Sequence, residues 1–184
     1  MTAVVLYESM FGNTRRIAEA IGDGLAPFTE VRVALVSAGA ADPADAELVV
    51  VGAPTHAHSL PRATSREEAA VWARDPDKHL DLETGATDPG VREWLESRPA
   101  APAHWAAFGT RVDIPRIFAG DASAAIERRM RRLGSHPVVD SECFLVTLEN
   151  TLVDGELDRA REWGGSIARA MFAEHAAAGG SKEG

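Results

Sequence analysis

The sequence predicts an α/β protein: a doubly wound five-stranded parallel sheet, strand order 2-1-3-4-5, in a three-layer α/β/α arrangement. Five short, apolar, β-rich segments alternate with segments whose apolar residues recur every three or four positions. The first and third of these segments are apolar throughout, which is typical of strands buried on both faces. Crossover connections between parallel strands are right-handed, and this rule narrows the possible topologies to the doubly wound ones.

The first strand is expected over residues 3–7 (AVVLY), with a helix after it that extends to Leu25. Residues 31–36 (VRVALV) are expected as a second strand near an edge, and residues 48–51 (LVVV) as a central third strand. An Ala/Gly/Asp/Pro loop separates these two strands. The inward positions of the helix are spaced three and four apart, at Thr14, Ile17, Ala18, Ile21 and Leu25.

Residues 57–101 are interpreted as one long crossover with helices over 65–74 and 90–97. Residues 105–110 and 143–148 are expected as the fourth and fifth strands, with a helix over 121–133 between them. Asp154 can cap the last helix. Its inner face would carry Leu157, Ala160, Trp163, Ile167 and Met171. One domain is expected over residues 1–175, with a disordered tail over 176–184.

Length and charge narrow the class of protein. With 184 residues the chain has the size of one domain, and 19 Lys plus Arg against 28 Asp plus Glu give a formal net charge of −9. This charge has the wrong sign for nucleic-acid binding and favours basic protein partners. No apolar run is long enough to span a membrane and the start lacks basic residues, so a cytoplasmic protein is expected. The single cysteine, Cys143, excludes an internal disulfide.

The loops after the first and third strands, residues 8–14 and 53–61, should meet at the switch point of this sheet, where ligands bind. The first loop, SMFGNT at residues 9–14, runs straight into a helix, whose unpaired N–H groups can hold a phosphate without a lysine. An ordinary helix cap is the alternative interpretation. Neither a Walker loop nor a dinucleotide fingerprint occurs here. Glu8 and Gly52 stand where a response-regulator receiver has its acidic residues.

Two segments resemble the flavodoxin family: VLYESMFGNT at residues 5–14 and VGAPTH at residues 51–56. The first is similar to the family's phosphate loop except for Phe11, and the second to its Gly-x-Pro-Thr-aromatic loop except for His56. The resemblance extends to Gly109-Thr110 and to the opening of the last helix, so it covers most of the chain. It implies a flavodoxin-like fold and bound flavin mononucleotide (FMN).

The resemblance also implies roles for individual residues. In the first loop, the side chains of Ser9, Asn13 and Thr14 and the amides of Met10, Phe11 and Gly12 would hold the 5′-phosphate. Pro54, Thr55 and His56 would line one side of the isoalloxazine ring. The loop formed by Phe108, Gly109, Thr110 and Arg111 would meet the pyrimidine edge of the ring.

The chain departs from the family in its aromatic residues, because its only tyrosine, Tyr7, lies inside the first strand. His56 or His58 could replace a missing stacking ring. Trp72 is a second candidate to cover the flavin, although its spacing on a helix favours packing in the core.

The charges around the expected ring also depart from the family. Four arginines lie on or near the ring loops, where a typical flavodoxin is acidic: Arg62, Arg66, Arg111 and Arg116. They would either stabilise a reduced, anionic flavin or pair at the surface with Glu67, Glu68, Asp113 or Asp121.

Three functions remain open from the sequence. The first is an FMN-binding electron carrier that passes electrons from a flavodoxin reductase to an acceptor such as a cytochrome P450. The second is an FMN-dependent oxidoreductase of a small quinone- or porphyrinogen-like substrate, with arginines that receive an anionic group. The third is a flavodoxin fold that has lost flavin and serves as an interaction module.

Overall fold

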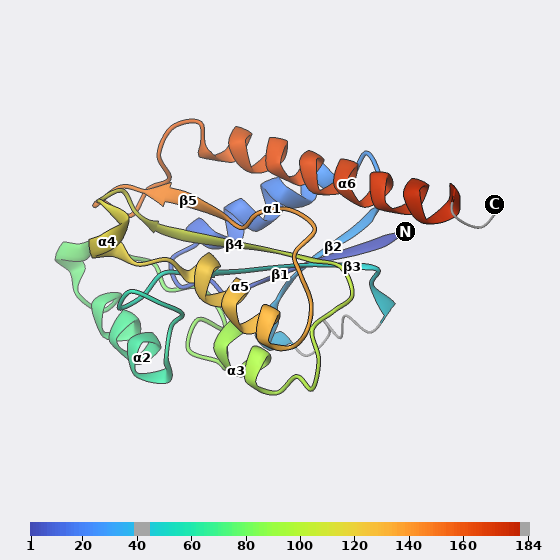
Figure 1. The fold of residues 1–184 in the computed structure, drawn as a ribbon. Helices are drawn as coiled ribbons and strands as arrows, with labels where there is room; N and C mark the ends of the chain where they lie inside the picture. Colours follow the sequence, from blue (N-terminus) through green and yellow to red (C-terminus); the bar gives the residue numbers. More distant parts are fainter. Residues whose placement is uncertain (39–44, 181–184) are drawn as a thin grey trace.

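A computed structural model describes residues 1–38 and 45–180 and contains a five-stranded, entirely parallel sheet (Figure 1). The strand order is β2-β1-β3-β4-β5, as the sequence predicts, with β2 at an edge and β3 in the centre. The strands are β1 (Thr2–Tyr7), β2 (Glu30–Leu35), β3 (Leu48–Pro54), β4 (Trp105–Val112) and β5 (Glu142–Val146).

Helices cover both faces of the sheet. In Figure 1, α1 (Asn13–Leu25) and α6 (Glu156–Gly180) lie on one face, and α3 (Val91–Glu96) and α5 (Ala122–Arg132) lie on the other, together with α2 (Ala63–Trp72). The described residues also form the short helix α4 (Arg116–Ala119) and the 3₁₀ turns η1 (Val36–Ala38) and η3 (Pro76–Lys78). The described part of the chain therefore forms three layers, which confirms the predicted fold class.

The alternation of side chains along β1 divides the core into two halves. Ala3 and Val5 point to the α1/α6 side, and Val4 and Leu6 point to the α3/α5 side. All four are buried, because a central parallel strand has helices on both faces. The inner face of α6 packs as the sequence predicts, with Ala160, Ile167 and Met171 buried and Leu157 and Trp163 partly buried.

Glycines allow α1 and α6 to pack closely. A Cβ atom on Gly24 would lie 2.1 Å from the carbonyl oxygen of Arg161, and one on Gly164 would lie 2.4 Å from the carbonyl oxygen of Ile21. No side chain fits at such distances, so the two backbones contact each other directly. This contact fixes α1, whose amino end faces the carboxyl edge of the sheet.

Several boundaries differ from the sequence prediction. β3 and β4 extend to Pro54 and Val112, so residues 108–111 are strand residues instead of a loop. The last helix begins at Glu156, after Gly155 with a φ of +85°, and Asp154 lies outside it. Residues 176–180, expected in a disordered tail, belong to α6. Residues 39–44 of the Ala/Gly/Asp/Pro loop and 181–184 of the expected tail lie outside the described residues.

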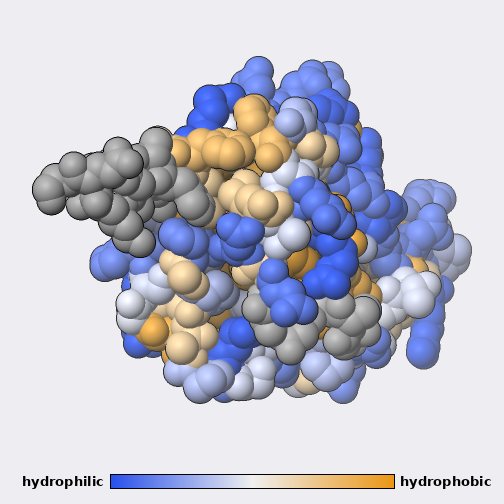
Figure 2. Space-filling view, turned by 90° about the vertical axis from the view of Figure 1, so that its right-hand side faces the viewer, coloured by the Kyte–Doolittle hydropathy of each residue, from blue (hydrophilic) through white to orange (hydrophobic). Residues whose placement is uncertain are grey.

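The amino ends of the strands form the face drawn in Figure 2, where hydrophilic side chains predominate and apolar side chains gather in the upper part of the view. No helix within residues 1–38 and 45–180 combines the length and apolar character that a membrane crossing requires.

Candidate functional site

The amino end of α1 lies directly behind the carboxyl end of β1. Gly12, the residue before the helix, has a φ of +89°, a left-handed conformation that glycine adopts at little cost. Its N–H donates to the Ser9 hydroxyl at 3.2 Å. Within the described residues, no protein acceptor is found for the backbone N–H groups of Phe11, Asn13 and Thr14. These free donors at a helix amino end can receive an anion.

The polar side chains of this loop are occupied by other parts of the protein. The buried hydroxyls of Thr14 and Thr110 share a hydrogen bond of 2.8 Å. The Asn13 amide donates to the backbone and the side-chain oxygens of Asn150, at 3.0 and 2.9 Å. The side chains therefore join the β1 loop to β4 and to the β5–α6 loop, and the backbone amides remain as the free donors.

A pocket of about 680 Å³ opens at the carboxyl edge of the sheet, between the loops that follow β1, β3, β4 and β5. This volume is in the range usual for small-molecule sites. Most of the residues predicted to bind FMN line it: Met10, Phe11, Asn13, Thr14, Pro54, Thr55, His56, Thr110 and Arg111. Residues from three further segments also line it: Trp72, residues 77–80, and residues 146–150.

Five predicted residues do not line this pocket. Ser9 is buried behind the loop, and Gly12 lies beside Glu83. His58 is exposed, and its backbone packs against Gly120, where a Cβ atom would lie 2.2 Å from the Cα of His58.

Phe108 and Gly109 correct the expectation that residues 108–111 meet the ring together. The Phe108 ring is buried in the α1/α6 core beneath Gly52, and Gly109 packs against the backbone of Ser123. Because side chains alternate along a strand, only part of such a segment can face the pocket.

Thr55 connects the pocket to α5. Its hydroxyl accepts the N–H of Ala122 at 3.0 Å, and its own N–H donates to the carbonyl of Thr110 at 2.7 Å. These bonds hold the β3 loop against the end of β4 and satisfy one amide at the start of α5. Thr55 thus fixes the shape of the pocket wall beside His56.

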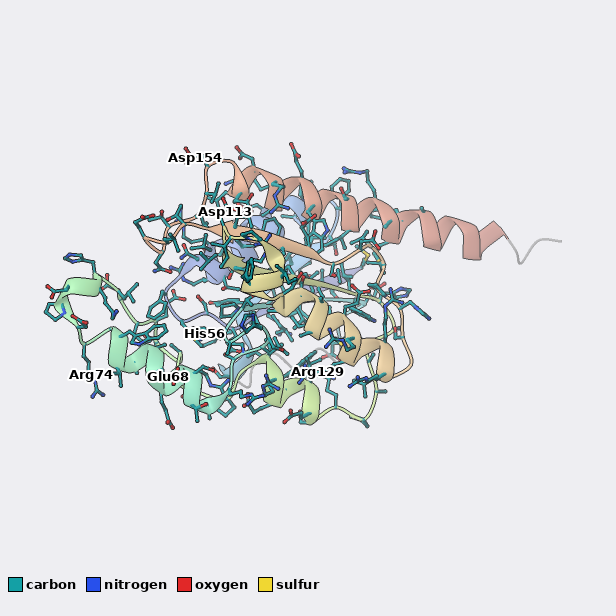
Figure 3. The ribbon with its side chains drawn as sticks, turned by 60° about the vertical axis from the view of Figure 1, so that its left-hand side comes forward. His56, Glu68, Arg74, Asp113, Arg129 and Asp154 are labelled. Atoms are coloured by element: carbon teal, nitrogen blue, oxygen red, sulfur yellow. The ribbon has the colours of Figure 1, made fainter. Side chains whose placement is uncertain are left out.

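The aromatic wall of the pocket comes from two elements. In Figure 3, His56 lies between α2 and the sheet. Its ring stacks on Trp72 at the end of α2, with centroids 5.9 Å apart and planes inclined by 28°. Burial lowers the pKa of His56, against the weaker opposing effect of Glu68, and this favours the neutral imidazole. Trp72 is 40% exposed, so the prediction that it packs in the core is wrong.

Arg111 is the arginine that lines the pocket. Its guanidinium donates to the carbonyls of Val112 and Ile114, at 3.1 and 2.6 Å. Its Nε is buried and has no partner within the described residues. A cation held in this way offers a free N–H group at the end of β4. The side chain of Arg116, a further arginine of the sequence prediction, lies outside the described part.

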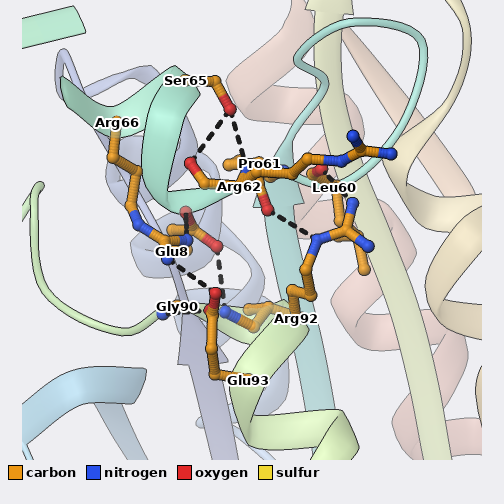
Figure 4. Close-up of polar contacts among 10 residues, drawn as sticks. Glu8, Leu60, Pro61, Arg62, Ser65, Arg66, Gly90, Arg92 and Glu93 are labelled. Atoms are coloured by element: carbon orange, nitrogen blue, oxygen red, sulfur yellow. Dashed lines mark hydrogen bonds and ion pairs between the residues drawn. The ribbon is translucent and has the colours of Figure 1, made fainter. Parts of the chain in front are cut away.

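Arg66 lies away from the pocket, in a buried cluster below β1 (Figure 4). Its guanidinium contacts Glu8 at 3.2 Å and Glu93 at 2.7 Å, partners that differ from the surface acids expected from the sequence. Glu8 also accepts the N–H of Val91 at 2.9 Å. Burial raises the pKa of Glu8, against the lowering effects of Val91 and Arg66. The cluster fastens α2 and the start of α3 to the end of β1.

A carboxylate approaches the β1 loop from outside. A Cβ atom on Gly12 would lie 3.6 Å from the carboxylate of Glu83. The backbone N–H of Glu83 donates to the carbonyl of Met10. Arg15 neutralises this charge, because its Nε lies 2.5 Å from the same carboxylate and its Nη1 lies 2.8 Å from Glu19. The free amides of the loop therefore lie near an acid that is already paired.

Comparison with solved structures agrees with this architecture. An archaeal flavodoxin is 23% identical over 92% of this chain and 97% of its own, with a TM-score of 0.60. Flavodoxin 2 from Bacillus cereus is 20% identical over 92% and 99%, with a TM-score of 0.62. The flavodiiron protein from Giardia intestinalis is 18% identical over 94% of this chain and 36% of its own, with a TM-score of 0.59. No protein-family model and no curated protein matches the sequence. The chain has the flavodoxin-like fold.

Proposed function

We propose that the pocket binds FMN and that the protein transfers electrons through it. The observation that carries this proposal is the free backbone N–H groups of Phe11, Asn13 and Thr14, at the edge of a pocket large enough for a planar ring. The 5′-phosphate would lie on these amides, and the ring would lie between the β3 loop and the end of β4. When bound, FMN supplies the redox chemistry and the protein tunes it.

Two further features fit a flavin. Arg111 has a buried Nε without a described partner, which suits the electron-rich pyrimidine edge of the ring. His56 and Trp72 give the pocket an aromatic wall, so the missing tyrosine does not leave the ring without a surface to stack on. The flavodoxin-like fold and the sequence resemblance favour the same ligand.

The phosphate position is tested by Thr14→Asp with Thr14→Asn as its matched control. Both changes remove the hydroxyl that pairs with Thr110, but only the aspartate adds a negative charge at the amino end of α1. We expect Thr14→Asp to bind FMN at least about tenfold more weakly than Thr14→Asn, because like charges repel at this range. Riboflavin, which lacks the phosphate, should bind both variants equally. Equal FMN affinity of the two variants would place the phosphate elsewhere.

As a carrier, the protein would receive electrons from a flavodoxin reductase and pass them to an acceptor such as a cytochrome P450. The formal net charge of −9 favours basic partners of this kind. The purified protein should be yellow from bound flavin. A colourless protein that does not take up added FMN would favour an interaction module and would refute the electron-transfer proposal.

A second candidate is an FMN-dependent oxidoreductase. Two cations on the pocket wall, Lys78 and Arg111, favour it, because they could hold an anionic quinone- or porphyrinogen-like substrate against the ring. Fast and saturable turnover of a small quinone, insensitive to salt, would support this function over that of a carrier.

A further inference from the structure

The end of α2 carries a large aromatic side chain that the core does not use. The buried residues of this helix are Ser65, Arg66 and Ala69, and all of them precede its last three residues. Trp72 is the last residue of α2, is 40% exposed and lines the pocket. Its neighbour Val71 is 62% exposed and does not line the pocket. The indole is therefore placed at the pocket and outside the core.

The anchoring of α2 gives this position a defined geometry. Arg66 fixes the helix to Glu8 and Glu93 through contacts of 3.2 and 2.7 Å, and both Arg66 and Glu8 are at least nine-tenths buried. The Ser65 hydroxyl accepts the N–H of Arg62 at 2.7 Å at the start of the helix. The helix is thus held at its first two turns (Figure 4). Trp72 is the last residue at its opposite end.

Two segments of the chain contact the Trp72 indole at the pocket. His56 stacks on it from the β3 loop, and Lys78 of η3 lies 5.9 Å from the ring centroid. Beside these two contacts Trp72 remains 40% exposed and lines the pocket, so the uncovered part of the indole is available to a planar aromatic ligand. An exposed tryptophan in a pocket is more informative than one on an open surface, because pocket walls supply most of the buried area of a ligand.

We propose that Trp72, held by His56 on a helix anchored by Arg66, is the aromatic surface against which the planar ring of the ligand packs. The proposal rests on the proposed function for the identity of that ring, the isoalloxazine of FMN. Trp72 belongs to α2, whereas the stacking group expected from the sequence, His56, belongs to the β3 loop. The lowered pKa of His56 favours its neutral imidazole, so the cation beside the indole is Lys78.

The test compares Trp72→Leu with Trp72→Phe, measured as the affinities of FMN and riboflavin by quenching of flavin fluorescence. Leucine keeps an apolar side chain without a ring, and phenylalanine keeps a ring. We expect Trp72→Leu to weaken the binding of both ligands by about 3- to 10-fold, as the loss of an aromatic pair implies. Trp72→Phe should keep most of the wild-type affinity. Val71→Ala is the matched control and should leave both affinities unchanged.

The outcomes separate this proposal from the proposed function. If wild-type protein binds FMN and Trp72→Leu binds both ligands as tightly as wild type, the ring does not lie against Trp72, and flavin binding itself stands. If wild type binds neither ligand, the proposed function fails and this proposal fails with it. Equal weakening by Trp72→Leu and Val71→Ala would show that damage to α2 is the cause and would overturn the proposal. Because both positions are exposed, thermal midpoints close to wild type are expected for all three variants.

Discussion

Replacing Arg66 by methionine should destabilise the protein strongly. The side chains of Arg66 and Glu8 are 3% and 4% exposed, so the variant leaves a buried carboxylate whose one remaining donor among the described residues is the Val91 N–H. Breaking a buried ion pair from one side typically costs about 3–5 kcal/mol. The matched control is Arg131→Met, which removes an exposed pair with Glu127 and should cost about 0–1 kcal/mol. Urea unfolding of both variants and wild type measures the difference.

The pH dependence of the Arg66→Met deficit tests the reason for it. Burial already raises the pKa of Glu8 above the ordinary value of 4.5, and loss of the guanidinium raises it further. A carboxyl with a raised pKa binds more protons in the folded state, so the free energy of unfolding falls as pH rises through that pKa. The deficit should therefore be larger at pH 8 than at pH 6. A deficit below about 1 kcal/mol, or one equal at both pH values, would refute the argument, and adding Glu8→Gln to Arg66→Met should restore part of the stability.

Two further predictions concern the proposed flavin. Arg111→Gln should lower the potential at which bound FMN is reduced to its anionic form, because the cation on the pocket wall is lost. The control Arg62→Gln lies outside the pocket lining and should leave this potential unchanged. A redox titration that finds equal potentials in wild type and Arg111→Gln contradicts this role. Electron transfer from a basic reductase, measured by stopped flow, should slow as the salt concentration rises. The formal net charge of −9 steers the encounter of the two proteins, and salt screens this attraction over about 8–10 Å. A rate that does not change with salt contradicts steering by charge.

The sheet and the place of the pocket could be predicted from the sequence because both follow from strong constraints. Continuous apolar runs such as 3–7 and 48–51 are stable as strands only with helices on both faces. Once the strand order is fixed, the loops after β1 and β3 must meet at the same edge, and the pocket is found there. Met10, Phe11, Thr55 and His56 line it for this reason.

Phe108 shows how a family resemblance can misplace a side chain. The apolar pattern predicts a strand over residues 105–110, which includes Phe108, but the resemblance treated residues 108–111 as a loop in which every side chain could face a ligand. The strand continues to Val112, so alternation applies: Ala106 and Phe108 pack in the α1/α6 core, while Trp105 and Ala107 pack on the other side. The small residue Gly52 beside Phe108 was the available signal, since a Cβ there would lie 2.0 Å from the ring.

The positions of Trp72 and Arg66 could not be predicted from the sequence. They depend on where α2 ends and on which contacts hold it, and a pattern of apolar residues does not give this information. α2 has few apolar inward positions, and it is fixed by the Arg66 ion pairs with Glu8 and Glu93, partners 58 and 27 residues away in the chain. Apolar spacing treats a tryptophan on a helix as a core residue. This holds for Trp163 on α6, which packs against the core, but it fails for Trp72, where polar contacts fix the helix. A charged residue that anchors a helix leaves the aromatic residue at the other end free to form the wall of a site.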